Sequence, residues 1–471
     1  SCAALTVAQV SSLSTSHISA LNTPHIGALD ESDIAEFAAT QIAALTSTQL
    51  NALSAANLAA FADTQIAALT ASQIGALNTT KIAALNETQV QALTATQIAA
   101  FATTQLRAFS NQNLAALDAA QVAALTATQI RGLTSTQLTS LEAGDIGEFT
   151  AAQVAAMHTT HIRDFGHTNL AAFPHTRLAA LSNNHVHAIS ATHVSTLTDA
   201  QIAALSTTQV AALTATQIGA LNTTDIAEFS AGQIAALTAT QIKALSSTNL
   251  ASMLETQVQA LTDAQLKAIS TTNVGQLTET QAAALTLTQM TAFTASQIAA
   301  FSTTNLSALA ADQIGALNTT QVRAFTATQM AALSAADMAE FTSTQIGSMH
   351  TTQIAALTAD NVTALTETQL QALTSAQVSR LGTEALIALD AAQVGALSTT
   401  QVRSLTTTQV AALQSTDIAE FLSAQIGAMT TSQIQAWSTT VIAALAAAQI
   451  GALAVTQVPA LTITQLDAQR V

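Results

Sequence analysis

The sequence predicts an all-α solenoid: a superhelix of short capped helices with one helix in every eight-residue repeat. Three observations predict this fold. An apolar pattern recurs every eight residues, a hydrogen-bonding pair occupies fixed places in most repeats, and glycine and proline are scarce. Units that stack on their neighbours form an array with one continuous core, so we expect a single solenoid domain over residues 1–471.

Two apolar columns run through the whole chain. The Leu column (residues 5, 13, 21 and so on to 461) holds Leu, Ile, Phe, Met or Trp at all 58 of its positions. The Ile column (residues 10, 18, 26 and so on to 466) holds Ile, Val, Leu or Met at 57 of its 58 positions, with Ala282 as the one exception. The register is never broken, which predicts about 58 units in one array.

A continuous α-helix and a β-solenoid compete with this prediction. In a continuous helix, eight residues overshoot two turns by about 80°, so the apolar stripe would wind around the helix and leave no face to bury. A β-solenoid suits the many Thr, Ile and Val residues. However, Ile and Leu three residues apart would point to opposite faces of a strand. Only 15 Gly and 3 Pro are present, too few to supply a turn in every unit. The β-solenoid stays as the alternative.

A capping pattern favours short helices. The cap column (residues 6, 14, 22 and so on) is mostly Thr, Ser, Asn or Asp, and the Gln column three residues later holds Gln in 37 of 58 units. Thr followed by Gln at this spacing is a capping box, in which the two residues satisfy each other's backbone N–H groups at a helix N-terminus. Clear cases are Thr126 with Gln129 and Thr214 with Gln217.

Each repeat is then a helix of about two turns that ends at the next cap. Ile and Leu, three residues apart, share one face of such a helix. A helix this short does not persist alone in water, so it must bury that face against other units. Expected core residues are listed here: Leu213, Ile218, Leu221, Phe229 and Ile234. Seven of the eleven basic residues occupy the outward column just after the Ile column. The handedness and the number of repeats per superhelical turn stay open.

Composition disfavours several functions. The net charge is −16 and the 11 basic residues are scattered, whereas nucleic-acid and anionic-membrane partners require clustered Lys and Arg. No stretch of about 18 apolar residues is present, so we expect no membrane span. The chain has no phosphate-binding loop, nucleophile elbow, Cys/His pair or HExxH motif, so we expect no enzyme and no cofactor. The single cysteine, Cys2, excludes an internal disulfide and reads as a small apolar filler, with a lipidated N-terminus as the rival interpretation.

An acidic variant of the repeat recurs five times, and we call each copy an acidic node. Each node has Asp in the Gln column and Glu three residues later: Asp33/Glu36, Asp145/Glu148, Asp225/Glu228, Asp337/Glu340 and Asp417/Glu420. The spacings alternate between 112 and 80 residues, which indicates duplication of a 192-residue segment. The functional alternative is a contact with a neighbouring chain or a Ca²⁺ site with Asp225 and Glu228 as ligands. Two carboxylates alone are too few for calcium.

Histidine is concentrated between His158 and His193, which contain seven of the ten histidines. His161, His185 and His193 replace Gln in its column, which makes them candidate zinc ligands. Zinc would require three or four imidazoles to converge, and mixed columns disfavour this. We therefore expect variation within the Gln column, with metal binding and a pH-sensitive patch as alternatives.

Two further features stand out. Pro459 falls inside an expected helix and should break it, so residues 455–471 are expected to form a modified end. Rows of Thr could order surface water as an ice-binding array, although the first Thr of each unit already has a capping role.

The octad Thr-x-x-Gln-Ile/Val-x-Ala-Leu, as in Thr214, Gln217, Ile218, Ala220 and Leu221, resembles repeat regions of very large bacterial secreted or surface proteins of adhesin type. The resemblance covers essentially the whole chain. It implies an extracellular or cell-surface structural role and carries over no catalytic residue. We expect a stalk, fibre or cell-surface filament whose partner is itself or further repeats of the same kind. The alternative is a binding module of adhesin, ice or metal type that uses outward-facing columns.

Overall fold

The computed structural model describes residues 6–468, and within them the protein is all-helical. This range contains 57 short α-helices and no strand. The predicted fold of short helices, one per repeat, is therefore confirmed, and the β-solenoid finds no support among the described residues. Cys2 and Leu5 lie outside this range.

Each helix begins one residue after its cap, at residues 7, 15, 23 and so on in steps of eight, and is four to six residues long. The series runs from α1 (Val7–Ser11) to α57 (Ile463–Ala468). One repeat departs from it: after α56 (Ala447–Gly451), residues 455–457 form a turn and Val458–Ala460 form the 3₁₀ helix η2. Pro459, which has no N–H group to donate within a helix, lies in this 3₁₀ segment.

The corners between helices are made by extended residues. Around α6 (Ser47–Ala52), Thr46 has φ −72° and ψ 156°, and Leu53 has φ −62° and ψ 151°. No residue of the described range has a positive φ. Each corner is thus open to ordinary L-residues, which explains how the chain turns at every repeat with so few glycines and prolines.

The chain divides into two compact units, residues 1–236 and 237–471. Within each unit, a helix packs on the helix three places further along the chain. In the first unit α3 (Thr23–Gly27) packs on α6, and α6 on α9 (Ala71–Ala76). In the second unit α43 (Ser343–Ser348) packs on α46 (Glu367–Ala372), and α46 on α49 (Ala391–Ala396).

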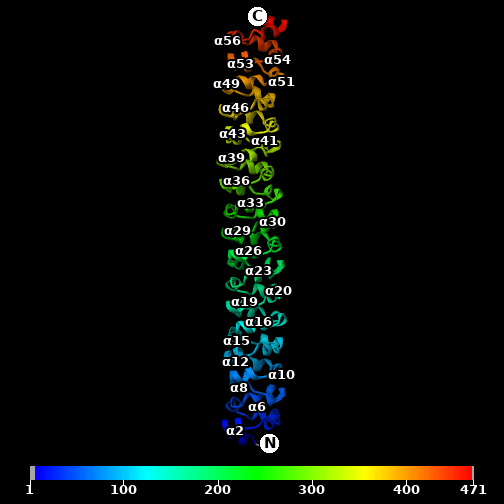
Figure 1. The fold of residues 1–471 in the computed structure, drawn as a ribbon, viewed down its shortest axis with the longest axis vertical. Coiled ribbons are helices and arrows are strands. Elements are labelled where there is room, and N and C mark those ends of the chain that lie inside the picture. The colour runs from blue at the N-terminus through cyan, green and yellow to red at the C-terminus, as the bar shows by residue number, and fades with distance from the viewer. Residues whose placement is uncertain (1–5, 469–471) are drawn as a thin grey trace. The chain divides into compact units, whose positions relative to one another are not determined.

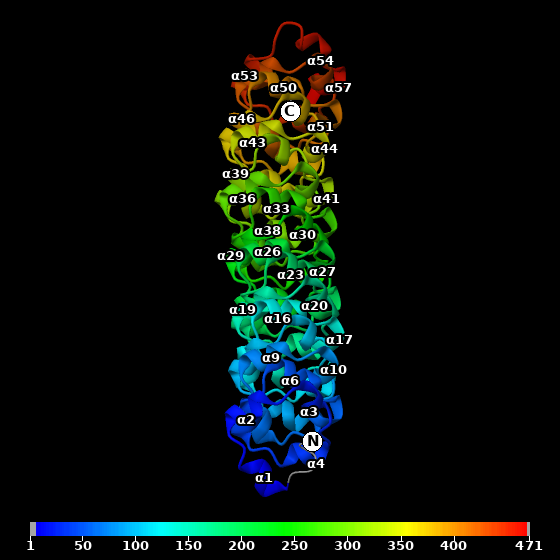
Figure 2. The ribbon, with the colours of Figure 1, turned by 60° about the horizontal axis from the view of Figure 1, so that its bottom comes forward.

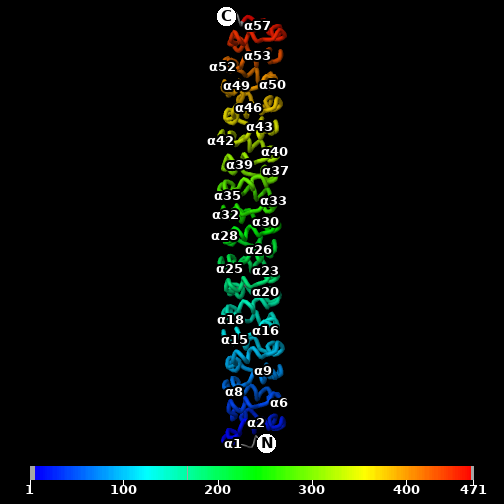
Figure 3. Tube along the Cα trace, turned by 60° about the vertical axis from the view of Figure 1, so that its left-hand side comes forward, coloured from blue at the N-terminus to red at the C-terminus, as the bar shows by residue number. Residues whose placement is uncertain are grey.

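Three repeats, or 24 residues, therefore form one turn. The colours of Figure 1 advance steadily as the turns of each unit follow one another, and Figure 2 shows α3, α6 and α9 one behind another. The Cα trace in Figure 3 shows the same succession of corners. A single continuous domain over residues 1–471 stays a prediction, because it depends on how the two units are joined.

The core of each unit consists of the two apolar columns. Every residue of both columns from Ile26 to Leu445 is buried, and the most exposed of them, Leu445, is 7% exposed. The five core residues named from the sequence, Leu213, Ile218, Leu221, Phe229 and Ile234, lie in this interior. Phe101 and Phe109, from consecutive repeats, meet edge to face with ring centroids 5.2 Å apart. Leu-column side chains of consecutive repeats thus touch inside the coil.

Candidate functional site

The Gln column forms the most regular polar contact of the structure. In α6, the Oε1 atom of Gln49 accepts the Thr46 N–H at 2.6 Å, and the Thr46 hydroxyl accepts the Gln49 N–H at 3.2 Å. This reciprocal pair is a capping box, which satisfies N–H groups that a helix leaves without internal partners.

The capping residues named from the sequence take this arrangement. Gln129 accepts the Thr126 N–H at 2.7 Å, and Thr126 accepts the Gln129 N–H at 3.3 Å. The corresponding distances between Gln217 and Thr214 are 2.6 and 3.1 Å.

The other end of the Gln side chain reaches the preceding turn, a contact that the sequence reasoning missed. The Nε2 atom of Gln49 donates to the carbonyl oxygens of Ile18, at 2.9 Å, and Leu21, at 2.7 Å. These carbonyls lie at the end of α2 (Thr15–Ala20), where a helix has acceptors without internal donors. One Gln therefore caps the start of its own helix and the end of a helix four places earlier.

Residues that replace Gln show which part of this contact matters. Asn57 donates to the Leu29 carbonyl at 3.0 Å, and Arg177 donates to the Phe149 carbonyl at 2.7 Å, in both cases 28 residues earlier. The Lys81 ammonium donates to the carbonyl of Asn51 at 2.9 Å. A hydrogen-bond donor that reaches the preceding turn is thus the property these residues share. Their recurrence in one column was the sequence signal for this second role.

In the acidic nodes, the Asp that replaces Gln still caps its own helix, but it has no hydrogen-bond donor for the preceding turn. The Asp225 carboxylate accepts the Asn222 N–H at 2.8 Å, as Gln would. An ionised carboxylate has no proton to donate to the preceding turn. Asp225 is only 5% exposed. Burial raises the pKa of its carboxyl group, with a further contribution from Asp199, while hydrogen bonds from Asn222 oppose the rise.

Three of the five node glutamates, Glu148, Glu340 and Glu420, lie near carboxylates from two successive turns. Burial first, and then the charges of Asp145 and Asp118, raise the pKa of Glu148. Asp118 is the N-cap of α15 (Ala119–Ala124), one turn before the helix that carries Glu148, α18 (Ala143–Glu148). The pKa values of Glu340 and Glu420 are raised in the same way, by burial and then by Asp337 and Asp312, or by Asp417 and Asp390. Glu228, the partner of Asp225, is half-buried.

Two of the three candidate histidines, His161 and His185, make the same two kinds of contact as Gln: a cap of their own helix and a hydrogen bond to the preceding turn. The Nδ1 atom of His185 accepts the Ser182 N–H at 3.3 Å, and its Nε2 atom lies 2.9 Å from the carbonyl oxygen of Met157, 28 residues earlier. His161 accepts the His158 N–H at 3.2 Å and is hydrogen-bonded to the backbone of Leu133, again 28 residues earlier. His193 is half-buried, and its buried Nδ1 atom has no hydrogen-bond partner.

The candidate metal ligands are not gathered into a site. Among residues 6–468, no group of three or more His, Cys, Asp or Glu side chains could hold a metal ion. His161 and His185 lie on stacked helices, while Asp225 and Glu228 belong to a separate node. In the same part of the chain, no helix has the length and apolar character needed to cross a membrane.

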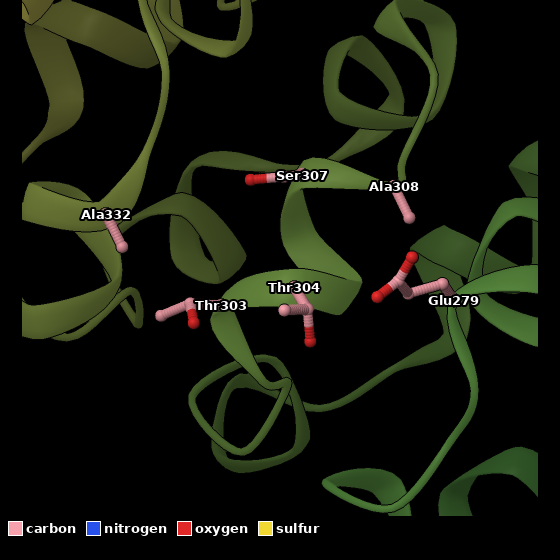
Figure 4. Close-up of a pocket in the computed structure, with 6 residues that line it drawn as sticks. All are labelled: Glu279, Thr303, Thr304, Ser307, Ala308 and Ala332. Atoms are coloured by element: carbon pink, nitrogen blue, oxygen red, sulfur yellow. The ribbon is translucent and has the colours of Figure 1, made fainter.

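The surface hollows are small and lie between successive turns. One follows α35 (Glu279–Ala284), α38 (Thr303–Ser307) and α41 (Ala327–Ala332). Figure 4 shows Glu279 on one side of α38 and Ala332 on the other, with Thr303, Thr304 and Ser307 between them. Two more hollows are 192 residues apart, one beside Asn113 and one beside Asn305, where Asn replaces the longer Gln. They therefore repeat with the segment and are part of its periodic surface.

Together these observations define the class: the chain is a repeat protein built from short helices. Six segments of it match the family model of the ALTTAQ repeat: residues 42–79, 66–103, 98–135, 218–255, 330–367 and 386–421. One matched stretch reads Ala44-Leu45-Thr46-Ser47-Thr48-Gln49, which joins a Leu-column residue to the next capping box. A search of the curated proteins finds no match to the chain.

Proposed function

We propose that this chain is a structural repeat protein, a stalk, fibre or cell-surface filament, that acts outside the cell or on its surface. The observation that carries the proposal is the Gln bridge between turns, which recurs with the same partners 28 and 31 residues earlier in both units, for example at Gln49 and Gln345. A contact that repeats in this way extends a scaffold and creates no unique cleft.

The proposed mechanism is geometric. Each repeat buries one residue of each apolar column, and a fully buried aliphatic side chain contributes about 1.5–3 kcal/mol. Ordering the backbone opposes this gain in every repeat, so the stability of a turn depends on its neighbours. Because the same surfaces recur, a further turn of this kind fits where the last one ends. The proposed partner is thus the chain itself or further repeats, with no catalysis, no cofactor and no nucleic acid.

Electron microscopy of the purified full chain, over a range of concentrations and without added ligand, tests this proposal. We expect particles longer than a single chain, with the 24-residue turn continuing across each junction. Light scattering on the same samples should give masses that are multiples of 48.0 kDa. Single chains at every concentration would contradict self-assembly.

A binding module of adhesin, ice or calcium type is the second candidate. The observation that bears on calcium is the pair of carboxylates that recurs in the acidic nodes, such as Asp145 with Glu148. Because no group of three or more such side chains among residues 6–468 could hold a metal ion, a bound Ca²⁺ would need further oxygen ligands, such as backbone carbonyls or water. If the nodes bind calcium, Ca²⁺ should raise the unfolding temperature of the full chain. The double variant Asp145→Gln/Glu148→Ala carries the common residues of those two columns. Ca²⁺ should raise its unfolding temperature less than it raises that of the native chain. An unchanged unfolding temperature would exclude this version of the binding role.

A further inference from the structure

We propose that His161 and His185 form an acid-sensitive switch that loosens the contact between α20 (Thr159–Asp164) and α23 (Asn183–Ala188) when they become protonated. These helices are stacked on each other in the first unit. The inference concerns a regulated weak point within the scaffold and does not depend on what the scaffold is used for.

The hydrogen bonds of His185 fix its protonation state. The Met157 carbonyl can only accept, so Nε2 of His185 must carry the proton that joins them at 2.9 Å. The Ser182 N–H can only donate, so Nδ1 must be bare where it accepts this group at 3.3 Å. The site therefore requires the neutral imidazole with its proton on Nε2.

His161 repeats this arrangement one turn earlier. Its Nδ1 atom accepts the His158 N–H at 3.2 Å, and the ring is hydrogen-bonded to the backbone of Leu133. The two imidazoles are 4% and 6% exposed, His161 and His185 respectively. Both imidazoles are thus buried between stacked helices in the neutral form, which can accept one hydrogen bond and donate another, as a Gln side chain does.

Protonation would remove the capping hydrogen bond of each histidine. Nδ1 now accepts a backbone N–H group, and a protonated Nδ1 would instead point its own N–H at that donor, so the capping contact would be lost at both helices. It would also place two positive charges in a buried region of stacked helices. Gln cannot be protonated in this pH range, so repeats that carry Gln lack this response.

The surrounding charges only partly offset the added ones: Asp164 favours a proton on His161, whereas His158 and His185 oppose it. His161 is in edge contact with His158, with ring centroids 5.3 Å apart. Of the two helices, α20 also carries Arg163 and Asp164, which pair with each other at 2.9 Å, and α23 carries His187. The helices packed on the outer sides of this pair, α17 (Ser135–Thr139) and α26 (Thr207–Ala212), contain no ionisable side chain.

The direction of the pH effect follows from these contacts. Burial lowers the pKa of both imidazoles below the ordinary value, and the charge of His158 lowers it further. The unfolded chain, with an ordinary pKa of about 6.5, therefore binds more protons than the folded one as the pH falls through this region. The stabilising contribution of the neutral imidazoles is complete above about pH 7 and is lost on acidification.

Native-state hydrogen exchange of the full chain tests the switch. After correction for intrinsic rates, we expect amides of α20 and α23 to exchange about tenfold faster at pH 5.5 than at pH 7.5, because acid protonates both imidazoles and weakens this contact. The Gln-bearing helices α9 and α12 (Ala95–Ala100) are the internal reference and should change little. An equal change in both pairs of helices would overturn the proposal.

Three variants separate the switch from general acid sensitivity. His161→Gln/His185→Gln restores the usual residue of the column, so it should fold and lose the extra acid response. His187→Gln, at an exposed position of the same helix, should retain it. Gln129→His should create the response at α16 (Ala127–Gly132). Retention of the response by the double variant, or its absence from Gln129→His, would also overturn the proposal.

Discussion

The side-chain nitrogen of Gln217 lies 2.6 Å from the carbonyl oxygen of Ile189, a residue 28 positions earlier in the chain. The same nitrogen lies 2.9 Å from the Val186 carbonyl, and the side-chain oxygen accepts the Thr214 N–H at 2.6 Å. Gln217 is 2% exposed. A buried amide is tolerated here because both its donor and its acceptor are satisfied.

Replacing this residue should separate its two roles. Gln217→Ala removes the cap acceptor and leaves two carbonyls without their donor, so we expect a loss of about 2–4 kcal/mol in the local stability of α23 and α27 (Ala215–Gly219). Gln217→Asn should keep the Ile189 bond, as Asn57 does at its own site, and lose about 1 kcal/mol. Native-state hydrogen exchange measures both. Equal losses in the two variants would argue against the bridge.

A charged residue in the buried Leu column should destabilise the fold. Leu213→Asp places a carboxylate in the apolar interior, so we expect destabilisation by several kcal/mol, on the order of 3–5. Thr216→Asp, at an exposed position of the next repeat, is the matched control and should change stability by no more than about 0.5 kcal/mol. Urea unfolding followed by circular dichroism compares the two. If Leu213→Asp left the stability unchanged, this column would not be part of the core.

The effect of a proline substitution on stability should depend on its position in the repeat. Ala215 is the first residue of α27, where a helix tolerates proline, so Ala215→Pro should leave stability nearly unchanged. The N–H of Ala220 donates to the Thr216 carbonyl at 3.1 Å, and proline would remove this bond. We expect Ala220→Pro to cost about 3 kcal/mol. Thermal unfolding of the two variants distinguishes these outcomes, and similar losses would contradict the helix boundaries.

The acidic nodes that contain Glu148, Glu340 and Glu420 should become less stable as the pH rises. The pKa of Glu340 is raised, first by burial and then by Asp337 and Asp312, so the folded state holds its proton more tightly than the unfolded state. The folded state is therefore disfavoured as the pH rises from the ordinary glutamate pKa of 4.5 through the raised pKa of the folded state.

Glu340→Gln removes this charge and tests its effect. We expect the variant to unfold at a higher temperature than the native chain at pH 7.5, and at a similar temperature at pH 3.5. Glu367→Gln, at an exposed position of α46, is the control and should show little difference at either pH. A lower unfolding temperature for Glu340→Gln at pH 7.5 would show that this carboxylate stabilises the node.

Much of the fold was predictable because its determinants lie within single repeats. The Thr214–Gln217 pair and the spacing of Ile218 and Leu221 involve residues at most seven positions apart, and they specify a capped helix with one apolar face. The number of helices per turn was not predictable in this way. It depends on the angle at each corner, which the extended residues such as Leu53 and Thr46 set together with packing between turns.

The second role of Gln was missed for a related reason. A capping box already accounts for Gln in the third position of a helix, so nothing in one repeat requires a further partner. The signal lay in comparison across repeats, where Lys81 and Arg177 replace Gln although neither can accept a hydrogen bond. A 24-residue relation was also visible, since Asp33 is followed by Asn57 and Asp145 by Asn169 in the same column.

The 24-residue turn gives insertions and deletions two separate consequences. Removing one octad would leave every capping box and both apolar columns in register, yet it would rotate every later side chain of that unit by a third of a turn. Removing three octads would preserve both the fold and the direction in which each side chain points. In the first unit, α4 (Glu31–Ala35) and α28 (Thr223–Glu228) carry two acidic nodes separated by 192 residues, which is eight whole turns. Duplication by that length returns a node to the side of the stack from which it was copied.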